Sequence, residues 1–144
     1  MPCRRLSECA MMTNMISYIA ALVVFVAVDM VWLGTMSGRF YKPILRDLLL
    51  PQFNIAAAAA FYLLYPIGLV IFAINPALKA GGVSTALLYG GLFGFFTYAT
   101  YDLTNQVTLR NWSSLLTVVD MAWGTCLGAV TAASACWIVS RFAA

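Results

Sequence analysis

Three aspartates lie inside long apolar stretches of this sequence, at Asp29, Asp102 and Asp120. An ionisable side chain within a membrane span is costly in free energy, and such residues usually serve binding, transport or catalysis. Carboxylates in this setting hold a cation or carry a proton, and two together can share a proton and activate water. The sequence contains no histidine, which excludes His-ligated haem and zinc sites and any Ser-His-Asp triad.

Two of the aspartates belong to a repeated motif, which reads Val28-Asp-Met-Val-Trp32 and Val119-Asp-Met-Ala-Trp123. In each motif the Asp and the Trp are three residues apart and share one face of a helix. An indole N–H can donate a hydrogen bond to a carboxylate when both groups are removed from water. Trp32 and Trp123 are therefore candidate binding residues beside Asp29 and Asp120.

Small residues four apart in the sequence precede Asp102 and follow Asp120. The two rows are Gly90, Gly94, Tyr98, Asp102 and Asp120, Gly124, Gly128, Ala132. Small residues at this spacing let helix backbones approach closely in lipid. The two segments are predicted to pack tightly, with Asp102 and Asp120 on or near their shared seam. Tyr98 and Asn105 add hydrogen-bonding side chains near Asp102 and are candidate binding residues.

The composition identifies an integral membrane protein. Of the 144 residues, 63% are hydrophobic and 9% are charged, whereas soluble domains carry roughly 25% charged residues. So few charges exclude a soluble globular surface, and so much apolar surface excludes a disordered chain. A net charge of +3 without a dense basic face argues against nucleic-acid binding. The cysteines form no metal or redox motif, and we predict no metal site and no cofactor.

Four continuous apolar stretches are long enough to cross a bilayer as helices, at about residues 16–35, 55–74, 83–103 and 115–139. The predicted fold is an all-α integral membrane protein, a four-helix transmembrane bundle. Residues 38–50 mix cations with bulky apolar side chains, which predicts a short interfacial helix between the first two spans. Pro66 predicts a kink in the second span, and the Pro- and Gly-containing residues 75–82 predict a tight turn.

The domain organisation is a single membrane domain, residues 16–144, preceded by a tail, residues 1–15. Met11, Met12 and Met15 leave open a later start of translation, which would remove the tail.

The alternating direction of the spans brings all three aspartates toward one face of the membrane. At a rise of 1.5 Å per residue, their depths differ by only about 10 Å. The same face holds most loop cations, which are Arg39, Lys42, Arg46 and Arg110. A purely structural alternative follows, in which ion pairs and hydrogen-bonded carboxylates fix helix register and do nothing else.

The orientation depends on where translation begins. With the tail counted, four cations lie on each side, and the positive-inside rule does not decide. A start at Met12 or Met15 leaves two cations against four, which places the aspartate face in the cytoplasm.

Four motifs resemble the bacterial membrane proteins grouped as domain of unknown function 2177. They are Val28-Asp-Met-Val-Trp-Leu-Gly34, Phe61-Tyr-Leu-Leu-Tyr65, Tyr98-Ala-Thr-Tyr-Asp-Leu-Thr-Asn105 and Thr117-Val-Val-Asp-Met-Ala-Trp-Gly124. The resemblance covers residues 18 to about 139. It implies a multi-pass protein of the bacterial inner membrane and implies no reaction. It singles out six residues, Asp29, Trp32, Asp102, Asn105, Asp120 and Trp123.

The first functional hypothesis is binding or transport. A polar pocket at the membrane interface, lined by Asp29, Asp102 and Asp120, would hold a lipid headgroup or small amphiphile, so membrane lipids are the expected partners. Arg39 and Arg110 would contact an anionic group. Four helices are few for a monomeric transporter, and transport would imply a homodimer.

Two alternatives remain open at this point, so whether the protein is an enzyme is undecided. In the first, Asp102 and Asp120 are the catalytic pair of an intramembrane hydrolase. The layout is similar to that of lipoprotein signal peptidase, but the Asn-x-x-Asp-Arg motif of that family is absent, because Leu103 follows Asp102. In the second, the protein is a structural membrane subunit without a ligand.

Overall fold

The structure is a computed structural model that describes residues 2–142, with side chains described from residue 8 onward. The described residues form helices and short connections, and none of them lies in a strand. Four long helices make up the bundle: α1 (Pro2–Met36), α3 (Ile55–Leu69), α5 (Gly82–Thr108) and α6 (Ser114–Phe142). Shorter helical segments connect them: η1 (Ser37–Tyr41), α2 (Lys42–Leu45), η2 (Arg46–Leu48), η3 (Val70–Ile74) and α4 (Asn75–Ala80). The all-α fold class is confirmed.

Three helical segments in the described part of the chain are long and apolar enough to cross a membrane. They are Glu8–Leu48, Ile55–Ala80 and Ser114–Phe142. Helix α5 has 27 residues, a comparable length, but its second half carries Asp102 and a series of threonines that lower its hydropathy. The predicted interfacial helix corresponds to η1, α2 and η2, which continue α1 through wider and tighter turns. Helix α1 also runs without a break through residues 2–15, the predicted tail.

The second apolar segment changes its helical winding four residues after Pro66, the residue at which a kink is predicted. Helix α3 gives way to the wide-turned η3 at Val70, whose N–H bonds to the carbonyls of Pro66 and Ile67. Proline removes one helical donor, and a wide turn re-satisfies the neighbouring carbonyls.

The prediction of a tight turn over residues 75–82 is wrong. Residues Asn75–Ala80 form helix α4, and the chain reverses only at Gly81 and Gly82. Pro76 lies in the first turn of α4, directly after the wide-turned η3, and the chain stays helical through it to Ala80. Gly82 has a φ of +65°, in the left-handed region that favours glycine.

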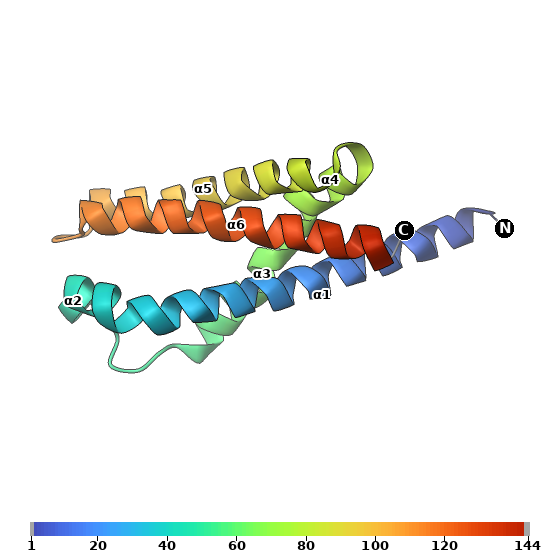
Figure 1. The fold of residues 1–144 in the computed structure, drawn as a ribbon. Helices are drawn as coiled ribbons and strands as arrows, with labels where there is room; N and C mark the ends of the chain where they lie inside the picture. The colour runs from blue at the N-terminus through green and yellow to red at the C-terminus, as the bar shows by residue number, and fades with distance from the viewer. Residues whose placement is uncertain (1, 143–144) are drawn as a thin grey trace.

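Helices α5 and α6 lie side by side along their length (Figure 1). A Cβ atom at Gly90 would overlap the carbonyl oxygen of Gly128, and one at Gly94 would overlap that of Gly124. The backbones therefore touch along the predicted seam, and only glycine fits there. Phe25 of α1 is fully buried and stacks on Tyr65 of α3 at a centroid distance of 4.7 Å.

One end of the bundle gathers the elements that carry the predicted site. Figure 1 shows α2 and the loop between α5 and α6 at this end, and the turn between α4 and α5 toward the other. The last turns of α1 and α5 and the first turns of α3 and α6 therefore meet at the same end, as the alternating spans predict.

Candidate functional site

Two of the three aspartates open onto one pocket of about 300 Å³ at this end of the bundle, here called the carboxylate pocket. All four long helices and η1 contribute to its wall. The lining residues are Asp29, Trp32, Leu33, Tyr41, Ala58, Phe61, Tyr62, Tyr98, Asp120 and Trp123. Five of the residues that the sequence singles out therefore share one pocket.

Asp29 is held by donors from two other helices. Its side chain is 5% exposed. The hydroxyl of Tyr62 donates to Oδ2 at 2.6 Å, and the indole N–H of Trp123 donates to Oδ1 at 3.2 Å. Both donors are neutral, and no lysine or arginine among the described residues lines the pocket beside Asp29.

Two successive hydrogen bonds connect Trp32 to Asp120 through Tyr41. The hydroxyl of Tyr41 donates to Oδ1 of Asp120 at 2.5 Å, and the indole N–H of Trp32 donates to the oxygen of that hydroxyl at 3.0 Å. Successive hydrogen bonds of this kind polarise and strengthen one another in a desolvated site. The chain links α1, η1 and α6 through side chains alone.

The two Val-Asp-Met-x-Trp motifs meet face to face. The rings of Trp32 and Trp123 stack with centroids 4.1 Å apart and planes inclined by 7°. Each indole N–H acts across the helix pair: Trp123 donates to Asp29 directly, and Trp32 reaches Asp120 through Tyr41. An indole N–H does donate to a carboxylate, as the motif suggests, but the bond joins Trp123 of α6 to Asp29 of α1 and does not form within one motif. The two helices are close enough for this because the rings of Trp32 and Trp123 stack between them.

Asp102 is buried elsewhere. Its side chain is 0% exposed, and neither carboxylate oxygen has a hydrogen-bond partner among the described residues. It does not appear among the residues that line the carboxylate pocket. The glycine contacts pair Gly94 with Gly124, and continuing this antiparallel register places Asp102 opposite the first turns of α6. The structure thus brings Asp29 and Asp120 together, and it places Asp102 on the α5–α6 seam.

The remaining sequence candidates lie outside the described lining of the carboxylate pocket. Arg39 is exposed on η1, and Asn105 is half-buried near the end of α5. Arg110 is exposed and lies near α2 and η2, where it lines a shallow polar depression with Arg46. None of the three contacts Asp29 or Asp120 through a hydrogen bond that the described structure contains.

Tyr41 and Tyr62 are the functional candidates that sequence reasoning missed. Both donate to the buried carboxylates, yet Tyr41 fits an ordinary aromatic belt at the membrane interface. Tyr62 belongs to the motif Phe61-Tyr-Leu-Leu-Tyr65, which gave a signal through the family resemblance. Nothing in the sequence pattern indicates that η1 turns Tyr41 back toward α6.

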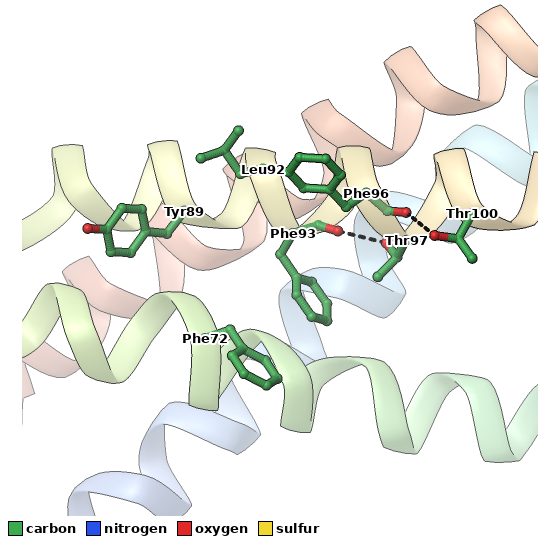
Figure 2. Close-up of a pocket in the computed structure, with 7 residues that line it drawn as sticks. All are labelled: Phe72, Tyr89, Leu92, Phe93, Phe96, Thr97 and Thr100. Atoms are coloured by element: carbon green, nitrogen blue, oxygen red, sulfur yellow. Dashed lines mark hydrogen bonds between the residues drawn. The ribbon is translucent and has the colours of Figure 1, made fainter.

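Two further pockets follow the carboxylate pocket along α5. A pocket of about 410 Å³ shares Phe61 and Tyr98 with it and is also lined by Tyr65, Thr97 and Tyr101. Thr97 then leads to a depression of about 560 Å³ (Figure 2). The figure shows Phe72 of η3 facing Phe93 of α5, with Tyr89, Leu92 and Phe96 along the same helix. We call these two pockets together the apolar groove.

The family model described as Predicted membrane protein (DUF2177) matches residues 14–137. No curated protein and no solved structure matches the chain. The matched residues include every residue that lines the carboxylate pocket.

Proposed function

The chain belongs to the Predicted membrane protein (DUF2177) family, and from this premise we propose that it is a multi-pass protein of the bacterial inner membrane that binds or moves an amphiphile. The polar end of the amphiphile would occupy the carboxylate pocket, and its hydrocarbon chain would lie along the apolar groove.

A four-span arrangement, with α5 as the fourth span, is part of this proposal. Its 27 residues correspond to roughly 40 Å at 1.5 Å per residue, enough to cross the hydrocarbon core. Its glycines contact the backbone of α6, which is itself long and apolar enough to cross. A helix that touches α6 along this length would cross the bilayer with it, and Asp102, the one charged residue of α5, is fully buried.

The observation that carries the proposal is the convergence of Asp29 and Asp120. Each buried carboxylate costs several kcal/mol unless it is compensated, and these two come from separate helices to one pocket. A buried carboxylate with a purely structural role is expected to be compensated by an ion pair with a cation or by several hydrogen bonds. These carboxylates keep unused acceptor positions that face a space large enough for a small group.

The apolar groove supports an amphiphile over a wholly polar ligand. It begins at Phe61 and Tyr98, which also line the carboxylate pocket, and continues to Thr97 and Phe93. Its later lining is mostly aromatic and aliphatic, with Thr97 and Thr100 beside these side chains, and Phe96 and Phe72 are each 62% exposed on the bundle surface. The polar carboxylate pocket therefore suits the headgroup of an amphiphile, and the apolar groove that follows it along α5 suits the hydrocarbon chain.

The hydrolase alternative draws no comparable support. It requires Asp102 and Asp120 to act on one water, yet Asp102 is fully buried and Asp120 lines the carboxylate pocket together with Asp29.

The proposal is tested by filling the carboxylate pocket without touching its acids. Ala58→Trp places a large ring in the pocket, whereas Ala60→Trp adds the same ring on the other side of the exposed first turns of α3. Lipids that co-purify with each variant in dodecyl maltoside are extracted and quantified by mass spectrometry. We expect Ala58→Trp to lose the lipid species that the wild type and Ala60→Trp retain. Equal lipid content in all three proteins would overturn the proposal.

A further inference from the structure

We propose that the carboxylate pocket selects a cation, an ammonium or quaternary ammonium group that forms the polar end of the bound amphiphile. This inference rests on the proposed function and adds the chemical class of the headgroup.

The charge of the lining favours a cation. Two aspartates face the pocket, and no lysine or arginine is among its lining residues in the described part of the chain. An anionic group would approach two carboxylates in a medium of low dielectric, where like charges repel strongly. A cation would instead offset the burial cost of both carboxylates.

The hydrogen-bond inventory gives the same result independently. Five lining side chains can donate, and within the described structure four of them already do so inside the site: Trp32, Tyr41, Tyr62 and Trp123. Among the described lining side chains, only Tyr98 remains available to donate. The carboxylates, by contrast, offer about four acceptor positions each; Asp29 receives two hydrogen bonds and Asp120 receives one. The pocket is therefore short of donors and rich in acceptors, and a ligand must bring positive charge or N–H groups.

The aromatic walls suit a quaternary ammonium in particular. Six of the ten lining residues are aromatic. Phe61 has no hydrogen-bonding group at all, and Trp32 and Trp123, which stack on each other, both line the pocket. Ring faces attract ammonium groups, most strongly when both are desolvated, and cages of aromatic residues with nearby acids recognise methylated ammonium ions.

The experiment compares amphiphiles that share one chain and differ in the charge of the head. Dodecyltrimethylammonium, dodecylammonium and dodecyl sulfate are titrated into the wild-type protein in dodecyl maltoside micelles by isothermal titration calorimetry. Choline tests the head without the chain. We expect saturable binding of both cations and binding of dodecyl sulfate that is weaker by about tenfold or more.

The variants assign the binding to the pocket. We expect the double substitution Asp29→Asn and Asp120→Asn to weaken dodecyltrimethylammonium by about tenfold or more, while Asp47→Asn, an exposed carboxylate on η2, leaves it unchanged. Phe61→Leu keeps an apolar wall and removes a ring face, and it should weaken the quaternary head by about two- to fivefold. Circular dichroism and elution volume verify the fold; if the double variant unfolds, the single Asn variants replace it.

The outcomes separate this inference from the proposed function. Binding of dodecyl sulfate as tight as that of the cations, or cation binding that survives the double substitution, overturns the cation inference and leaves the amphiphile proposal standing. Choline that binds as tightly as dodecyltrimethylammonium supports the cation site and overturns the amphiphile proposal, because the chain then adds nothing. Absence of saturable binding for every probe overturns both.

Discussion

At the scale of residues, the site is a network in which neutral donors hold two acids in a fixed geometry. Tyr62 and Trp123 hold Asp29, while Tyr41 holds Asp120 and is itself held by Trp32. The repeated motif predicts that the aspartates and tryptophans take part in the site, because their spacing puts Asp and Trp on one face of each helix. Their cross-helix pairing was not, because it depends on how far each helix rotates about its own axis.

Removing a single hydroxyl from this network should lower stability. Tyr62→Phe deletes the donor to Asp29 Oδ2 and leaves that buried oxygen without it. We expect the free energy of unfolding to fall by about 1–3 kcal/mol in mixed-micelle denaturation. Tyr89→Phe, on an exposed ring of α5, is the matched control and should change it by less than about 0.5 kcal/mol. Equal effects of the two substitutions would contradict the role of the Tyr62 hydroxyl.

The buried Asp102 leads to a different expectation. Its oxygens have no hydrogen-bond partner in the described structure, so an amide of the same shape gives up no hydrogen bond. Asp102→Asn should keep the free energy of unfolding within about 1 kcal/mol of the wild type or raise it. Binding of dodecyltrimethylammonium should also be preserved, because Asp102 does not line the carboxylate pocket. A loss of binding at unchanged stability would show that the α5–α6 seam takes part in the site.

At the scale of elements, the sequence predicts the helices better than their rotation. The four apolar stretches lie within α1, α3 with η3, α5 and α6. The glycine rows predict which faces of α5 and α6 meet, because a missing side chain marks a backbone contact. Helix α3 is apolar on all sides, so no periodicity indicates that Tyr62 faces Asp29. The segment after Ile74 is helical where the sequence predicts a turn, because proline and asparagine are compatible with both structures.

The backbone contact between α5 and α6 should tolerate no side chain. Gly94→Val places its Cβ where the carbonyl oxygen of Gly124 lies, and the helices must separate. We expect the free energy of unfolding to fall by about 1–3 kcal/mol or more. Gly34→Val is the matched control, because nothing lies within 4 Å of a Cβ at Gly34. Thermal denaturation in detergent, followed by circular dichroism, compares the two variants, and similar melting temperatures would refute the close contact.

At the scale of the whole molecule, the four long helices bring two loops to the end that holds the acids. A membrane with α5 as a full span places the loop before α3 and the loop after α5 on one side. In that arrangement the turn at Gly81 would lie on the other side. The sequence predicts this arrangement from the number of apolar stretches, whereas absolute orientation depends on the cation count at the N-terminus.

Cysteine labelling tests the four-span topology. In a background without the four native cysteines, single cysteines replace Gln52, Leu109 and Ala80, and intact cells are treated with a membrane-impermeant maleimide. We expect residues 52 and 109 to react alike and residue 80 to react in the opposite way. The same readout from all three positions would exclude α5 as a membrane span.

The first turns of α3 have a consequence for how a ligand arrives. Residues 55–60 are all exposed, and Ala58 among them borders the carboxylate pocket. Because alanine side chains are short, this side of the pocket is bordered by an exposed helix surface, which would face hydrocarbon if α3 spans a membrane. An amphiphile dissolved in the leaflet would slide in sideways without passing through water. Occupancy would then follow its mole fraction among the surrounding lipids, and dilution of the cell suspension would leave it unchanged.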